Sequence, residues 1–230
     1  MKQIQYCKLP REHIIIDNFL PAGVAKQCLE EAVSLEKFYK PAKVFMMDDK
    51  LDDCSDCQKL VQLTRKMTRE NDIVYMDDTF ENKRNDSVIL SSLHFEIQRP
   101  ETRSIIEKMG GMFKIIKSVT NSETILSRYG MCDFYDWHYD IIPENLGRRI
   151  LTIAYYFNKE PPTFVGGELL IAGDTIDDVK IIEPKHNRAV IFESSAALHS
   201  VNYTKLNGGF EEGRFSANFW LGFTSPYNFR

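Results

Sequence analysis

Apolar residues in the first half of the chain recur mainly at helical spacing. Residues 13–19, with three consecutive isoleucines, predict a short strand. From Pro21, a residue suited to a first helical turn, apolar residues recur every three or four positions and predict a helix. The same spacing predicts helices over residues 87–97 and 101–116, with Pro100 and Gly110-Gly111 as punctuation. The buried face of the first helix carries Val24, Cys28, Ala32 and Leu35.

From residue 123 onward, short β-branched and aromatic runs alternate with clusters of Gly, Pro, Asn and Asp. Eight short strands at this spacing favour a jelly roll (double-stranded β-helix) or a small barrel. We therefore predict a mainly β fold with flanking helices (α+β), formed as a single domain over residues 1–230. Its jelly-roll core spans residues 123–222, and the strand, supporting helices and lid loops of residues 1–122 buttress it. The eight predicted strands are 124–129, 137–141, 150–157, 168–171, 179–182, 189–192, 199–203 and 215–222.

The composition is that of a globular protein, and it narrows the classes of partner. A chain of 230 residues with 43% hydrophobic residues is long enough to bury a core. Lys and Arg number 29 against 33 Asp and Glu, without a dense basic run, so nucleic acid is not an expected partner. No apolar stretch approaches the ~20 residues that span a bilayer. We therefore expect no membrane association and a cytoplasmic location.

The five cysteines are an odd number, and a chain of this length folds without disulfides, so free thiols are predicted. Cys54 and Cys57 have the spacing of zinc ligands. The sequence has no second cysteine pair to complete a four-ligand zinc site. The surrounding acidic stretch, residues 48–58, favours an exposed loop.

His138 and Asp140 stand two positions apart in a predicted strand, where alternate side chains project to one face. A histidine from a distant strand would complete a set of two histidines and one carboxylate. That set leaves coordination positions open and is typical of iron(II) oxygenases. His94-Phe95-Glu96 repeats the spacing but lies in a predicted helix, where positions i and i+2 diverge. We interpret His94 as a packing or surface residue.

His199 is the candidate for the third ligand. It opens a predicted strand 61 residues after His138, behind the apolar run 189–192. The alternative interpretation is an ordinary core histidine. His13 heads the first strand and His186 sits in a charged turn, so both are predicted to face solvent.

Arg214 begins the last predicted strand, whose alternation places Arg214, Ser216 and Asn218 on one face. Polar residues on an otherwise buried strand indicate a wet or liganded interior. Arginine supplies the best bidentate fork for a carboxylate, so Arg214 is a candidate anchor for an oxo diacid. The alternative is a polar edge that faces solvent.

Five ordered motifs together resemble the 2-oxoglutarate and iron(II)-dependent oxygenases, in particular their prolyl 4-hydroxylase-like branch. Residues 127–140 resemble the segment that leads into the family's His-x-Asp, and residues 149–158 look like its next core strand. Residues 164–169 resemble its Gly-Gly-Glu turn. His199-Ser-Val resembles the distal histidine segment, and Arg214 the cosubstrate anchor. These motifs cover about residues 123–222.

The resemblance implies iron(II) ligands, a cosubstrate and dioxygen as the second substrate. Arg214 would bind the C5 carboxylate of 2-oxoglutarate, and ascorbate could support turnover. The interval of 15 residues between His199 and Arg214 is longer than usual in the prolyl hydroxylases, and Arg148 or Arg149 is the fallback anchor. The implied metal ligands are His138, Asp140 and His199, and the implied cosubstrate contacts are Arg214, Tyr129 and Tyr156, with Ser216 as an additional hydrogen-bond donor.

The implied reaction is hydroxylation of an unactivated C–H bond, in a prolyl or other residue of a peptide or protein. A hydroxylase of a free amino acid or small metabolite has the same core and stays open as an alternative. Two further alternatives are a cupin-type iron dioxygenase that uses no oxo acid and a non-catalytic binding barrel. Long irregular segments, residues 40–86 and the loop after Asp140, suit a lid over the substrate. The oligomeric state stays open.

Overall fold

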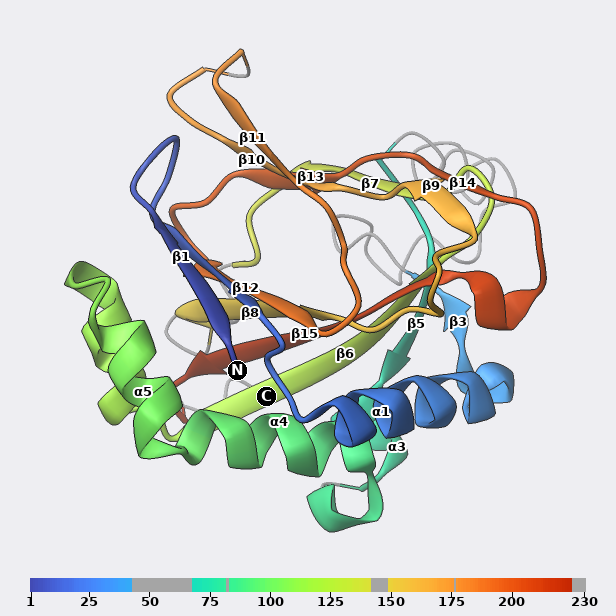
Figure 1. Ribbon diagram of the computed structural model, residues 1–230, viewed down its shortest axis with the longest axis horizontal. Helices are drawn as coiled ribbons and strands as arrows, with labels where there is room; N and C mark the ends of the chain where they lie inside the picture. The colour runs from blue at the N-terminus through green and yellow to red at the C-terminus, as the bar shows by residue number, and fades with distance from the viewer. Residues whose placement is uncertain (43–67, 82, 142–148, 176, 225–230) are drawn as a thin grey trace, which may run out of the picture.

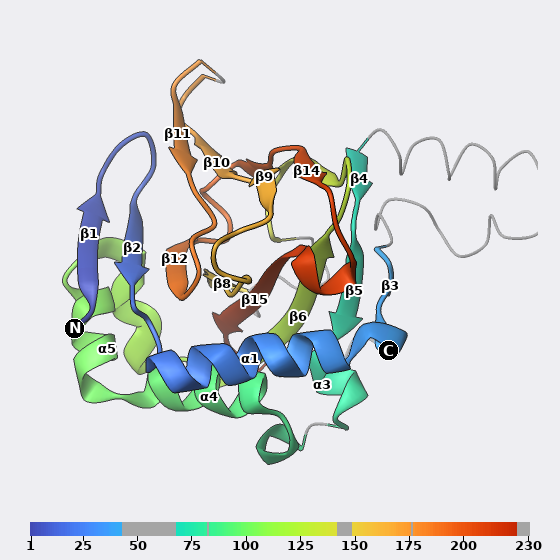
Figure 2. The same ribbon diagram turned by 45° about the vertical axis from the view of Figure 1, so that its right-hand side comes forward.

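Two β-sheets face each other, and helices cover the outer face of the larger one (Figures 1 and 2). The computed structural model describes residues 1–42, 68–81, 83–141, 149–175 and 177–224. The larger sheet has the order β1-β2-β12-β8-β15-β6-β5-β3, the smaller sheet the order β11-β10-β13-β7-β4, and β14 pairs with β9 in a separate ribbon. This antiparallel, two-sheet arrangement confirms the predicted mainly β, double-stranded β-helix fold.

The strands of the larger sheet come from both ends of the chain. They are β1 (Gln3–Cys7), β2 (His13–Asp17), β3 (Lys40–Pro41), β5 (Asp72–Tyr75), β6 (Asn121–Tyr129), β8 (Leu151–Tyr156), β12 (Arg188–Glu193) and β15 (Arg214–Gly222). The smaller sheet contains β4 (Arg69–Glu70), β7 (Phe134–His138), β10 (Leu169–Ala172), β11 (Val179–Ile182) and β13 (His199–Val201). The ribbon contains β9 (Phe164–Gly166) and β14 (Thr204–Leu206).

Central strands of the larger sheet are buried on both faces, because helices cover one face and the smaller sheet the other. In β8, Leu151, Ile153 and Tyr155 pack into the cluster shared with the helices. The alternate residues Ala154 and Tyr156 face the smaller sheet. A slip of one residue would exchange these two faces, so burial fixes the register of the strands. The polar residues of β15 are thereby turned toward the space between the sheets.

The helices supply the second wall of the core. They are α1 (Ala22–Ser34), α3 (Met76–Thr79), α4 (Val88–Gln98) and α5 (Pro100–Glu107), with 3-10 turns at Glu36–Phe38, Arg84–Asp86, Gly111–Lys117 and Phe210–Glu212. Helix α4 begins where the Ser87 hydroxyl accepts from Leu90 N at 3.1 Å. Fully burying one aliphatic side chain of this wall contributes about 1.5–3 kcal/mol. Helices α1 and α4 lie side by side beneath the sheet in both views.

The predicted helix over residues 101–116 is wrong in its second half. Helix α5 begins at Pro100 and ends at Glu107, and a 3-10 helix starts at Gly111. Gly110 has a φ of +86°, in the left-handed region that stops an α-helix and favours glycine. The glycine pair therefore breaks the helix that the apolar spacing alone predicted.

Several strands were not expected from the sequence. β1 is almost wholly exposed and so carries no apolar alternation, although it pairs with β2 along its length. β9 and β14 are three residues each, too short for a periodic pattern. That residues 1–230 form one domain stays a prediction.

Three cysteines of the described chain, Cys7, Cys28 and Cys132, are free thiols, as predicted. Cys54, Cys57 and the acidic loop 48–58 lie outside the described residues, as does most of the predicted lid. No helix in the described ranges is long and apolar enough to cross a membrane.

Candidate metal and cosubstrate site

His138, Asp140 and His199 meet between the sheets, where β7 and β13 run side by side in the smaller sheet (Figure 1). His138 ends β7 and lies directly opposite His199, the first residue of β13. The distance from His138 Nε2 to Asp140 Oδ1 is 3.7 Å, and that from His199 Nε2 to Asp140 Oδ2 is 3.6 Å. The candidate ligand atoms all lie within 4.8 Å of one another.

Asp140 reaches this cluster from outside a strand, so the predicted strand over residues 137–141 is wrong at its end. β7 stops at His138, because β13 begins at the opposite His199 and offers no partner beyond it. Asp140 N instead donates to Ser194 O at 3.2 Å. A backbone bend at Asp140, and not the alternation of a strand, therefore turns the carboxylate toward both histidines.

The backbone fixes which nitrogen of each histidine is free. His138 Nδ1 lies 2.7 Å from Asp136 O, and His199 Nδ1 lies 2.8 Å from Ala197 O. A carbonyl oxygen only accepts hydrogen bonds, so each Nδ1 carries a hydrogen, and Nε2 is the nitrogen left to bind a metal ion. In metal sites, a hydrogen bond from the other ring nitrogen to a carbonyl oxygen orients the histidine that binds the metal.

Burial and the neighbouring His199 lower the pKa of His138 to about 3, so the His138 ring is neutral. Burial by itself would raise the pKa of Asp140. The two histidines and the Thr152 hydroxyl outweigh burial and hold the pKa of Asp140 below its ordinary value. Two imidazole Nε2 atoms beside one carboxylate fit a divalent metal ion with open coordination positions, of which iron(II) is one.

Thr152, in β8, holds the Asp140 carboxylate from behind. Its hydroxyl donates to Asp140 Oδ2 at 2.7 Å and lies 2.9 Å from Ser194 Oγ. We expect Thr152→Val to weaken the affinity for a divalent metal about 10- to 100-fold, because valine keeps the shape but leaves the carboxylate free to turn. Titration with Mn(II) measures this affinity.

The matched control is Thr124→Val. Thr124 is also buried in a strand, but its hydroxyl has no hydrogen-bond partner among the described residues. Its replacement should leave Mn(II) affinity unchanged. An unchanged affinity in Thr152→Val would show that the hydroxyl does not position Asp140.

Arg214 lines the same pocket as the three candidate metal ligands. It begins β15, is 1% exposed, and shares the pocket with Ser216 and Asn218, as the strand alternation predicted. Arg214 Nε donates to Gly167 O at 3.1 Å and Nη1 donates to Ser216 Oγ at 2.9 Å. A guanidinium has five N–H donors, so donors are left for a carboxylate in the pocket.

Tyr129 and Tyr156 flank the Arg214 guanidinium, whose Cζ lies 4.6 Å and 4.8 Å from the centroids of their rings. Burial raises the pKa of Tyr129 and raises the pKa of Tyr156 to about 12, so both are neutral phenols. The buried Tyr156 hydroxyl has no hydrogen-bond partner among the described residues. Leaving a buried hydroxyl unpaired costs free energy, and a ligand oxygen in the pocket would satisfy it.

Arg149, one of the two fallback anchors, does not line this pocket. Arg149 pairs with Glu123 at 2.8 Å and its guanidinium lies 3.8 Å from the centroid of the Trp220 ring. Arg149 Nη1 also donates to Asp140 O at 3.3 Å. Arg148 lies outside the described residues. The geometry therefore favours Arg214 over Arg149.

Thr152 and Tyr135 are two residues of the site that sequence reasoning missed. Thr152 shares its strand face with Tyr156, so the alternation of residues 151–156 was a usable signal. Tyr135 stacks on His138, with ring centroids 3.5 Å apart and an interplanar angle of 15°. Tyr135 and His138 stand three positions apart in the sequence, and a bulge between β7 and β13 brings both side chains to the same face of the sheet. No simple period reveals such a pair.

The competing His94-x-Glu96 motif lies in α4, as predicted. His94 is half-buried, with Nδ1 3.1 Å from Arg84 Nη1. Glu96 is 2% exposed and is bound by Lys2 and Thr102 on another side. The helix keeps the two side chains apart, so the interpretation of His94 as a packing or surface residue is confirmed.

The prediction that His13 and His186 face solvent is wrong for His13. His13 is fully buried, because β2 lies between β1 and β12 rather than at a sheet edge. Its Nδ1 lies 2.7 Å from Arg11 O. His186 is half-buried, and its Nδ1 accepts from Asn158 N at 3.1 Å.

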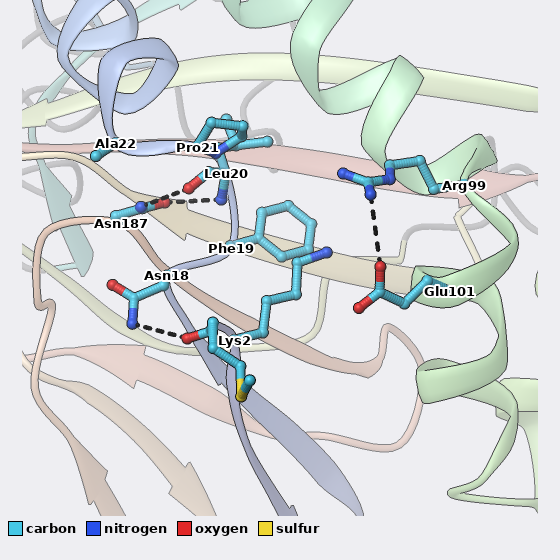
Figure 3. Close-up of a pocket in the computed structure, with 10 residues that line it drawn as sticks. Lys2, Asn18, Phe19, Leu20, Pro21, Ala22, Arg99, Glu101 and Asn187 are labelled. Atoms are coloured by element: carbon cyan, nitrogen blue, oxygen red, sulfur yellow. Dashed lines mark hydrogen bonds and ion pairs between the residues drawn. The ribbon is translucent and has the colours of Figure 1, made fainter.

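A roomier cavity, of about 430 Å³, lies between the N-terminal strands and helix α5 (Figure 3). Its polar groups bind one another: Asn187 donates to Leu20 O and accepts from Leu20 N, and Arg99 pairs with Glu101. No convergent set of free polar groups is left there among the residues drawn. The chemistry of the described chain therefore points to the smaller, buried pocket around His138.

Comparison with known proteins finds matches to the predicted jelly-roll core. Residues 124–222 match the model of the 2OG-Fe(II) oxygenase superfamily. An uncharacterized PKHD-type hydroxylase of Synechocystis sp. is 31% identical over 96 residues, which are 38% of this chain and only 32% of that protein.

Two solved structures share the fold. A prolyl-4-hydroxylase of Pseudomonas putida superposes with a TM-score of 0.63 at 18% identity, and the match covers 92% of each chain. A prolyl hydroxylase of Trichoplax adhaerens, solved with a peptide fragment of the hypoxia inducible factor oxygen degradation domain, gives a TM-score of 0.64 at 18% identity. That match covers 91% of this chain and 83% of the other.

Proposed function

Because residues 124–222 match the model of the 2OG-Fe(II) oxygenase superfamily, we propose that this protein is an iron(II)- and 2-oxoglutarate-dependent hydroxylase. One observation carries the proposal. The three candidate metal ligands and the buried guanidinium of Arg214 line one pocket between the sheets. Metal ligands and a carboxylate-binding guanidinium that line one pocket would suit a short oxo diacid.

With iron(II), dioxygen and 2-oxoglutarate bound, the site would convert the oxo acid to succinate and carbon dioxide and insert one oxygen atom into a substrate C–H bond. In this proposal His138, Asp140 and His199 would hold the metal ion and leave coordination positions open for other ligands. Arg214 binds the far carboxylate, and the hydroxyls of Tyr129 and Tyr156 donate to it. The surrounding apolar cluster keeps bulk water from the reacting atoms.

We propose a prolyl or other residue of a peptide or protein as the substrate. Support comes from the Trichoplax adhaerens neighbour, which was solved with a peptide fragment. A free amino acid or small metabolite is the second candidate class, since the pocket for the oxo acid is the same in both. A cytoplasmic location is part of the proposal, because the three free thiols of the described chain suit a reducing compartment.

The test is turnover by the wild-type protein with iron(II), 2-oxoglutarate, oxygen and ascorbate. We expect succinate to accumulate, and omission of the metal to stop it. A panel of proline-containing peptides and free amino acids, screened by mass spectrometry for the gain of one oxygen atom, separates the two substrate classes. Oxidation without 2-oxoglutarate would instead favour a cupin-type dioxygenase, and metal binding without any turnover a binding module.

A further inference from the structure

The Gly166-Gly167 turn, at the end of β9, presses bare backbone against the side chain of Arg214. Gly166 has a φ of +82° and Gly167 a φ of +69°, and residues other than glycine rarely adopt such positive values. A Cβ on Gly167 would lie 3.3 Å from Arg214 Cγ and 3.5 Å from Arg214 Cδ. It would also lie 3.0 Å from Thr204 Oγ1. A side chain at Gly167 would therefore press on the aliphatic part of Arg214 and on the Thr204 hydroxyl.

The same turn also holds the guanidinium. Gly167 O accepts the Nε hydrogen of Arg214, while Ser216 accepts from Nη1 and the two tyrosine rings flank the plane. These contacts to the aliphatic chain, to Nε and to Nη1 restrict the Arg214 guanidinium to one orientation. A fork fixed before binding loses less conformational entropy when a carboxylate arrives.

Residues at β14 hold the Gly166-Gly167 turn in place. Gly167 N donates to Tyr203 O at 3.2 Å, and Thr204 lies opposite Gly166 in the ribbon. Thr204 also joins the turn that leads into β7, because Cys132 N donates to Thr204 O at 2.8 Å and Thr204 N donates to Asp133 O at 2.9 Å. The start of β14 thus binds both the Gly166-Gly167 turn beneath Arg214 and the turn that precedes β7.

β14 lies within the long interval between His199 and Arg214. We propose that this interval and the Gly166-Gly167 turn form a positioning device for the cosubstrate anchor, with Gly167 as the positioning residue that fixes Arg214. The inference rests on the proposed function, since it assigns Arg214 to the far carboxylate of 2-oxoglutarate. It explains why residues between the distal histidine and the anchor build a ribbon rather than a plain loop.

The experiment is 2-oxoglutarate binding to the full chain loaded with Mn(II), measured by titration calorimetry without turnover. Gly167→Ala should raise the Kd for 2-oxoglutarate severalfold, because a Cβ 3.3 Å from Arg214 Cγ makes that side chain give by a few tenths of an ångström and so misplaces the guanidinium. The affinity for Mn(II) should stay within about twofold. In turnover assays the loss should appear in the KM for 2-oxoglutarate, with kcat retained at saturation.

Gly110→Ala is the matched control, because Gly110 has a similar φ of +86° but its Cβ would meet nothing within 4 Å. It reports the cost of backbone strain without any contact to Arg214, and its Kd for 2-oxoglutarate should equal that of the wild type. If Gly167→Ala does not fold, Gly167→Asn replaces it, since asparagine accepts positive φ more readily and still places a Cβ against Arg214.

A folded Gly167 variant that binds 2-oxoglutarate as tightly as the wild type overturns the inference and leaves the proposed function intact. Equal weakening in Gly110→Ala also overturns it, because strain alone would then account for the effect. A wild-type protein that binds Mn(II) but no 2-oxoglutarate overturns the proposed function, and the inference with it. A rise in Kd confined to position 167 supports the positioning role.

Discussion

Replacing Asp140 by asparagine is expected to abolish turnover and to weaken metal affinity by more than about 100-fold, beyond the loss typical of removing an outer-shell partner. Asparagine keeps the size of the side chain and its place beside Thr152. It removes the one negative charge among the three candidate ligands, which lies 3.7 Å and 3.6 Å from the two histidine Nε2 atoms. Two imidazoles without the carboxylate bind a divalent metal ion much less tightly.

The measurement combines Mn(II) titration, thermal unfolding and succinate release. Bound metal raises the melting temperature of a protein that binds it only when folded, so Mn(II) should stabilise the wild type and not Asp140→Asn. His94→Gln is the control, because His94 belongs to the same kind of His-x-acid pair but lies on α4. Metal affinity lost equally in His94→Gln, or retained in Asp140→Asn, would contradict the assignment of the metal site.

Arg214→Ala is expected to raise the Kd for 2-oxoglutarate by about 30-fold to several thousand-fold, since truncating one partner of a buried, hydrogen-bonded charge pair costs about 2–5 kcal/mol. Arg214 is 1% exposed, so no solvent compensates the lost donor. Arg214→Lys should fall between the wild type and the alanine variant, because lysine keeps the charge without the planar fork. Mn(II) affinity should not change in either variant.

Arg149→Lys is the informative comparison, because Arg149 was the alternative anchor. It binds Glu123 and stacks near Trp220 outside the pocket, so its replacement should leave the Kd for 2-oxoglutarate unchanged. A larger effect at Arg149 than at Arg214 would transfer the anchor to Arg149. Thermal unfolding of each variant separates a loss of binding from a loss of folded protein.

The spacing of apolar and polar residues was sufficient to place side chains correctly wherever a single periodicity ran through a whole helix or strand. Alternation in residues 214–222 placed Arg214 and Ser216 on the pocket face, because β15 is a central strand with two buried faces. Helical spacing placed His94 on α4 and separated it from Glu96. The order of motifs from residue 124 to residue 222 coincides with the range that matches the oxygenase superfamily.

Sequence by itself therefore determined the class of fold, the chemistry of the candidate ligands and the side of the last strand that carries the anchor, since these depend on residue type and local period. Only the tertiary structure decided that Asp140 reaches His138 and His199 from a bend, that His13 is buried, and that Gly167 lies against Arg214. Each of these depends on which distant strand lies alongside: β13, β12 and β14 respectively. Such pairings join residues far apart in the chain, and no local pattern contains them.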